Sequence, residues 1–151
     1  VTDASDVTVA CVPASGTTFP VGTTTVRCTA TDEAGNVGRG SVDVVVTDTT
    51  APVLSPLTSL TAEATGATGA PVTFAPTASD VVDGTVVVTC TPPSGSTFPL
   101  TTTNVDCRAT DRAGNTATGS FTVTVRDTTE PVITVGSVVS EATGPAGAVV
   151  T

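Results

Sequence analysis

One stretch of the chain occurs twice, as CVPASGTTFPVGTTTVRCTATDEAGN at residues 11–36 and as CTPPSGSTFPLTTTNVDCRATDRAGN at residues 90–115. The two copies are offset by about 79 residues, and roughly 60% of their aligned positions are identical. The same offset relates DTTAPV at residues 48–53 to DTTEPV at residues 127–132. The chain is therefore organised as a tandem repeat.

The DTT motifs mark the junctions between repeats. We assign residues 51–129 to one complete repeat, residues 1–50 to the C-terminal part of a repeat, and residues 130–151 to the N-terminal strands of the next. The first part would lack the equivalents of residues 52–73, which the last part would largely supply. We therefore expect neighbouring copies, or one continuous array, to complete the partial repeats head to tail.

The residue pattern predicts an all-β fold. Thr and Val, which suit strands, are frequent, whereas Lys, Met and Gln are absent. Apolar and polar residues alternate in three runs of the complete repeat, at residues 85–90, 103–109 and 120–125. Two further strands, which begin at prolines, are expected to open the repeat at residues 52–60 and 71–74. The alternation also predicts that Val42, Val44 and Val46 point inward in the first part. Short strands separated by turn clusters indicate tandem immunoglobulin-like β-sandwich repeats, with roughly seven strands each.

The four cysteines form two equivalent pairs at identical spacing, which predicts the disulfides Cys11–Cys28 and Cys90–Cys107. Closing each loop would stabilise its repeat by roughly 3 kcal/mol. A zinc site is the rival interpretation, but two cysteines per repeat without any histidine provide too few ligands. Disulfides indicate an oxidising compartment, so we expect an extracellular or cell-surface location.

Together these motifs resemble the HYR (hyalin repeat) domain, an immunoglobulin-like module of extracellular proteins. The resemblance is carried by VTC, PxSGxTFPxxTT, VxCxATDxAGN and FTVTVxDTTxP, which occur in that order. It covers the complete repeat and both partial ones, although Gly22 is replaced by Thr101 in the second copy. The resemblance implies tandem interaction modules of adhesion or surface-layer proteins, without catalysis and without an assigned ligand.

Calcium is the one cofactor that the sequence leaves open. The Asp-x-Ala-Gly-Asn turns and the junction aspartates could provide hard oxygen ligands, the candidates being Asp32, Asn36, Asp48, Asp111, Asn115 and Asp127. Alternatively, Asp and Asn in such turns hydrogen-bond their own backbone, with Gly35 and Gly114 in the left-handed region. Glu63 and Glu141 are interpreted as single solvated carboxylates.

Composition excludes several function classes. The net charge is −9, and the five arginines form no run, which argues against nucleic acid as a partner. No apolar run is long enough to span a membrane. The absence of His, Lys, Tyr and Trp removes the usual catalytic groups and sugar platforms, so we expect no enzyme. We predict a structural or adhesive fibre repeat; the alternatives are a decoration or tail module of a virus particle and a carbohydrate-binding accessory module.

Overall fold

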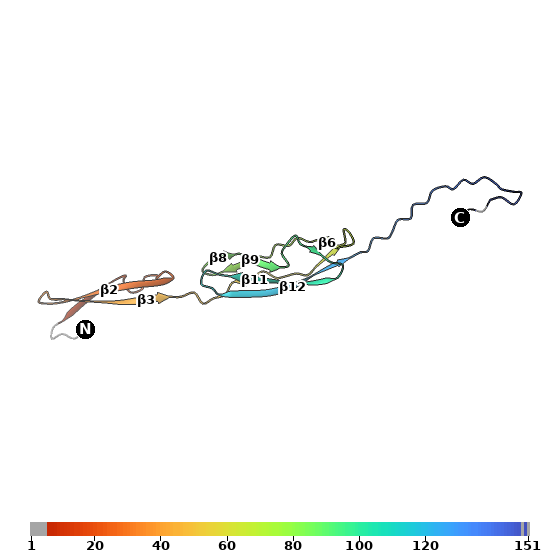
Figure 1. Cartoon of the computed structure of the whole chain (residues 1–151). Coiled ribbons are helices and arrows are strands. Elements are labelled where there is room, and N and C mark those ends of the chain that lie inside the picture. Colours follow the sequence, from red (N-terminus) through yellow and green to blue (C-terminus); the bar gives the residue numbers. More distant parts are fainter. Residues whose placement is uncertain (1–5, 149, 151) are drawn as a thin grey trace.

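A computed structural model describes residues 6–148 and residue 150, and these residues follow one another in three parts (Figure 1). The first part is a three-stranded sheet, the second is a complete sandwich, and the third is an extended segment after the last strand. All regular structure in the described residues is β-strand, as the sequence predicts. None of these residues belongs to a helix suited to crossing a membrane.

The first sheet is antiparallel and consists of β1 (Val7–Val12), β2 (Gly22–Asp32) and β3 (Val37–Val46) in that order. No second layer covers this sheet within the described part of the chain. The prediction that Val42 points into a core is therefore wrong for this structure, since 58% of its surface is exposed.

The complete repeat has two main layers, and the immunoglobulin-like sandwich expected from the sequence is confirmed. One layer has the strand order β5-β12-β11-β9, the other has the order β4-β7-β8, and β10 pairs with β6 beside them. The strands are β4 (Val53–Leu54), β5 (Leu60–Glu63), β6 (Ala70–Pro71), β7 (Ala78–Asp80), β8 (Gly84–Val86), β9 (Val88–Thr91), β10 (Thr97–Phe98), β11 (Thr102–Thr110) and β12 (Thr116–Arg126).

Two of the expected strands are each divided between the two layers. The run at residues 85–90 is interrupted at Val87, so that β8 pairs with β7 while β9 pairs with β11. The run at residues 52–60 gives β4 in one layer and leads to β5 in the other. Pro56 lies between them and has no N–H for a strand hydrogen bond. By changing layers, both runs close the sandwich along its edges.

The core of the complete repeat lies between these layers. Phe98, Val105 and Val123 are almost fully buried and pack with Phe121 from β12. Phe74 contacts Phe121 edge to face, with ring centroids 5.0 Å apart. A second small cluster, formed by Ala78, Val86 and Ala109 with the side chain of Leu54 against it, joins β7 and β8 to β11. These two clusters thus hold the layers of the sandwich together.

Candidate functional site

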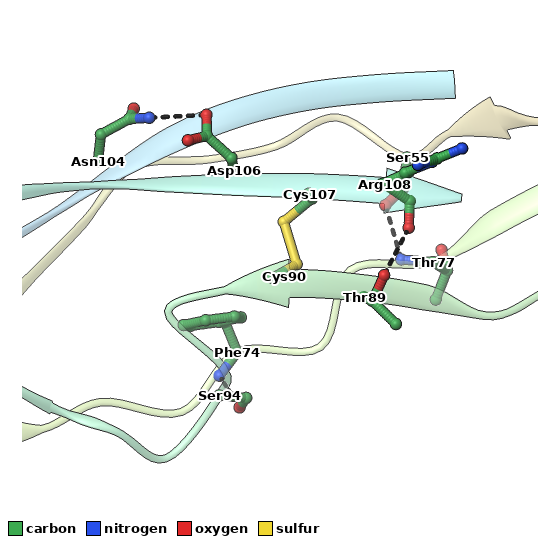
Figure 2. Close-up of a disulfide and its surroundings, with 10 residues drawn as sticks. All are labelled: Ser55, Phe74, Thr77, Thr89, Cys90, Ser94, Asn104, Asp106, Cys107 and Arg108. Atoms are coloured by element: carbon green, nitrogen blue, oxygen red, sulfur yellow. Dashed lines mark hydrogen bonds between the residues drawn. A yellow bond between two sulfur atoms is a disulfide. The ribbon is translucent and has the colours of Figure 1, made fainter. Parts of the chain in front are cut away.

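The structure joins the cysteines in the pairs that their spacing predicts, Cys11–Cys28 and Cys90–Cys107. Cys90 on β9 lies directly opposite Cys107 on the neighbouring strand β11, with 4.1 Å between their Cα atoms (Figure 2). Cys11 and Cys28 are opposite each other in the same way on β1 and β2. Each disulfide therefore connects adjacent strands within one sheet.

The two Asp-x-Ala-Gly-Asn turns have the same hydrogen bonds. In the first, the backbone N–H of Asn36 donates to Asp32 Oδ1 and its side-chain amide to Asp32 Oδ2, both at 2.7 Å. The side-chain bond from Asn36, followed by the bond from its backbone, lowers the pKa of Asp32. In the second turn, Asn115 donates to both carboxylate oxygens of Asp111 at 2.7 and 2.9 Å. Both turns thus use their carboxylates internally, and Gly35 and Gly114 have φ values of 86° and 94°.

The second turn also holds the linker that enters the complete repeat. Asn115 Nδ2 donates to the backbone carbonyl of Asp48 at 3.2 Å. Of the six residues predicted as calcium ligands, the structure therefore connects Asp48, Asp111 and Asn115. Asp32 and Asn36 lie in the first part, and Asp127 follows β12 in the next linker. Calcium binding by these six residues stays a prediction.

Three carboxylates meet where this linker reaches the sandwich. Oxygens of Asp48, Asp80 and Asp83 lie within 4.8 Å of one another. Asp80 ends β7, and its Oδ1 accepts hydrogen bonds from the backbone N–H groups of Val82 and Asp83 at 2.7 and 2.9 Å. The bond from Asp83, followed by that from Val82, lowers the pKa of Asp80, so this carboxylate is ionised at neutral pH.

Asp83 links the same site to the second Asp-x-Ala-Gly-Asn turn. Its Oδ2 accepts a hydrogen bond of 2.7 Å from the backbone N–H of Arg112, and its Oδ1 lies 3.5 Å from the Arg112 guanidinium. The Arg112 side chain is largely exposed, so this ion pair contributes little to stability. The aspartate cluster is thus connected through the backbone of Arg112 to the turn that holds Asp48.

Asp80 and Asp83 are not among the ligands that the sequence predicts. A signal was present, because the spacing Asp-x-x-Asp before the first cysteine of the complete repeat also occurs at Asp3 and Asp6. Asp3 lies outside the described residues, and Asp6 is exposed. The distance between the two copies of this motif differs by two residues from the distance between equivalent cysteines. The two motifs therefore do not align when the repeats are compared at one fixed offset.

Glu63 has a different position from the one expected. Its carboxylate accepts hydrogen bonds from the backbone N–H and hydroxyl of Thr128, at 2.7 and 2.8 Å, and from the hydroxyl of Thr129 at 3.0 Å. These bonds, of which the backbone bond from Thr128 has the largest effect, lower the pKa of Glu63. Glu63 is exposed to solvent, as the sequence suggests, but it has a role that the sequence did not predict: it fastens the linker that leaves the complete repeat.

We expect Glu63→Gln to reduce the acid sensitivity of the complete repeat. A carboxylate whose pKa is lowered by folding stabilises the fold above its ordinary value of 4.5, and this stabilisation is lost as the pH falls through the lower value of the folded state. Glutamine does not titrate in this range, so the variant should be less stable than the wild type at neutral pH and should lose less on acidification. Thermal unfolding followed by circular dichroism at a series of pH values measures both effects.

Glu141→Gln is the matched control, because Glu141 begins the same Glu-Ala-Thr-Gly motif in the third part of the chain. Glu141 is exposed and accepts no hydrogen bond within the described residues. Its variant should keep the pH profile of the wild type. Superimposable profiles for Glu63→Gln and the wild type would contradict the role assigned to Glu63.

Comparison with known proteins gives consistent matches along the chain. The sequence model of the HYR domain matches residues 1–46 and residues 47–125. A hyalin of Strongylocentrotus purpuratus is 42% identical over 125 residues, which cover 78% of this chain and 10% of the relative. A hyalin of Lytechinus variegatus is 38% identical over 130 residues, which cover 81% of this chain and 24% of the relative. The chain thus spans a tenth to a quarter of the length of these two relatives.

Proposed function

This chain belongs to the HYR domain family, and on that premise we propose that it is a structural and adhesive segment of an extracellular or cell-surface protein. Its repeats act by assembling head to tail into an extended array, and its role is non-catalytic. The family match and the two disulfides support the extracellular location, since disulfides persist in oxidising compartments.

The observation that supports head-to-tail assembly is the difference between two equivalent strands. In the complete repeat, Phe121 and Val123 of β12 are 6% and 0% exposed. Their equivalents on β3 are Val42, which is 58% exposed, and Val44, which is half-buried. The same residue pattern is thus covered in one repeat and open in the other, and an open apolar sheet face favours pairing with another segment.

The open face carries a hollow whose equivalent is filled in the complete repeat. It has a volume of about 310 Å³, and its lining includes Cys28 and Gly40. In the complete repeat, Gly119 takes the place of Gly40, and a Cβ built on it would lie only 2.8 Å from Leu57 Cδ1 and 3.4 Å from Leu54 Cδ1. The two leucines thus pack where the first sheet has open space, because a Cβ on Gly40 would meet no atom within 4 Å.

The third part of the chain is related to the segment that carries Leu54 in the complete repeat. Residues 130–141 are related by the repeat to residues 51–63, with Ile133 equivalent to Leu54. They form no strand in the structure, and their apolar side chains are 71–94% exposed; these are Val132, Ile133, Val135, Val138 and Val139. We infer that this segment of one repeat unit covers the β1–β3 sheet of another, either along one chain or between two chains.

Substitution of Gly40 by valine tests this assembly. The Cβ atom would meet no atom within 4 Å, so we expect the thermal unfolding of the isolated chain to be unchanged. Filling the hollow should nevertheless block the entering segment. We expect the wild type to associate with increasing concentration in sedimentation velocity experiments, and Gly40→Val to associate at least about tenfold more weakly.

Ser41→Val is the control, because alternation along β3 places Ser41 on the opposite face of the same strand. It adds a similar apolar side chain and should leave association unchanged. Equal weakening by both variants would indicate a general surface effect, and a wild type that remains monomeric at high concentration would contradict assembly through this face.

A further inference from the structure

We propose that Asp48, Asp80 and Asp83 bind one calcium ion, which fastens the linker between repeats to the end of the complete sandwich. This ligand set differs from the one that the sequence suggested, because two of its three members come from the β7–β8 turn. Asp48 is the only residue that both sets share.

The separation of the three carboxylates fits a single calcium ion. Their oxygens lie within 4.8 Å of one another. Calcium binds oxygen ligands at about 2.3–2.6 Å, so two oxygens on the same ion can lie no more than about 5 Å apart. The pairwise separations in the cluster therefore lie within the range that one ion can bridge. Calcium also accepts irregular geometry and completes its shell with water or with the second oxygen of a carboxylate.

Two oxygens of the cluster are buried without a partner. Oδ2 of Asp80 and Oδ2 of Asp48 have no hydrogen-bond donor within the described residues, although neither atom is accessible to solvent. Asp80 as a whole is only 8% exposed. The other oxygen of each residue is bonded: Oδ1 of Asp80 orders the β7–β8 turn, and Oδ1 of Asp48 accepts the N–H of Thr50 at 3.0 Å. A buried ionised oxygen without a partner is costly, and a bound cation would remove that cost.

The charge of the site favours a divalent ion. Three carboxylates carry three negative charges, and the exposed guanidinium of Arg112 offsets part of one at Asp83. The remaining negative charge matches Ca²⁺, and carboxylate oxygen is the hard ligand type that Ca²⁺ prefers. A site with three carboxylates should bind in the range of extracellular modules, with a Kd of about 10⁻⁴–10⁻³ M.

The position of Asp48 determines what the ion would do. Asp48 is the second residue after β3 ends at Val46, whereas Asp80 and Asp83 belong to the complete repeat. An ion held by all three would therefore fix the path of the linker where it meets the sandwich, in addition to the bond from Asn115 to Asp48. Calcium binding itself does not depend on the proposed function, but stiffening of an array does.

Titration calorimetry of the full chain with CaCl₂ tests the site. We expect one ion per chain in the stated affinity range, and at least about tenfold weaker binding for Asp80→Asn and for Asp48→Asn. Both substitutions keep a side-chain oxygen that can accept the bond to the local backbone while removing the charge. Asp106→Asn is the matched control: this residue lies on β11, is exposed and contacts Asn104, and its variant should bind like the wild type.

A second measurement does not depend on heat of binding. Calcium should raise the unfolding temperature of the wild type and of Asp106→Asn, but not that of Asp48→Asn, because a ligand stabilises only the state that binds it. The proposal is overturned if the wild type shows neither heat nor a thermal shift. It is also overturned if Asp32→Asn abolishes binding while Asp80→Asn does not, since the ion would then lie in the first Asp-x-Ala-Gly-Asn turn. Loss of calcium binding with intact self-association would leave the proposed function standing.

Discussion

Replacement of Phe98 by alanine is expected to lower the free energy of unfolding of the complete repeat by about 3–5 kcal/mol. Phe98 is 1% exposed and is among the largest fully buried side chains of the described structure. It packs in a core that also contains Phe74, with 6.4 Å between the two ring centroids, and Phe121. The chain has only four phenylalanines and no other aromatic residue. Because the core side chains are already close-packed, the smaller neighbours cannot refill the cavity that the loss of a phenyl ring would leave.

Chemical denaturation followed by far-ultraviolet circular dichroism measures this loss, since the chain has no Trp or Tyr for fluorescence. Phe19 is the equivalent residue in the first part and is only half-buried, so Phe19→Ala should cost clearly less. A loss below about 1 kcal/mol for Phe98→Ala would contradict the packing described for this core.

Removal of the disulfide in the complete repeat is expected to cost about 3 kcal/mol. Cys90 and Cys107 are 17 residues apart in sequence, and the loop between them carries Phe98 into the core. Without the bond, the unfolded chain gains conformational entropy, whereas the folded chain does not. The double variant Cys90→Ala, Cys107→Ala should therefore unfold at a lower denaturant concentration than the wild type.

The double variant Cys11→Ala, Cys28→Ala is the control, because it removes the equivalent bond from the β1–β3 sheet only. It should leave the unfolding transition of the complete repeat in place. Peptide mapping of the wild type before and after reduction checks the pairing directly. Free thiols, or a bond between the two repeats, would contradict the arrangement on which this expectation depends.

Features that depend on nearby residues could be predicted from the sequence. The alternation in β11 and β12 and the turn after Asp111 reflect strand geometry and backbone conformation, which a few neighbouring residues specify. The cysteine pairing also follows from sequence, because two equivalent pairs with short spacing leave few alternatives. The motifs of the repeat also indicated the HYR domain family, and the comparison with known proteins confirms it.

The division of the strands between layers could not be predicted in this way. Val86 and Val88 belong to one alternating run, and nothing local indicates that the chain changes sheets at Val87. That change depends on which partner strand each half meets. The exposure of Val42 likewise depends on a covering layer and not on its own strand, although its pattern equals that of the buried Phe121.

The repeat, the strand pattern, the cysteine pairs and the turns thus follow from the amino-acid sequence, because each is specified by residues within one or two strands. The tertiary structure alone decided which carboxylates meet. Glu63 reaches Thr128 across 65 positions, and Asp48 meets Asp80 and Asp83 only because the linker passes the β7–β8 turn. Such contacts arise from the packing of separate elements, and the identity of a single carboxylate gives no information about its distant partners.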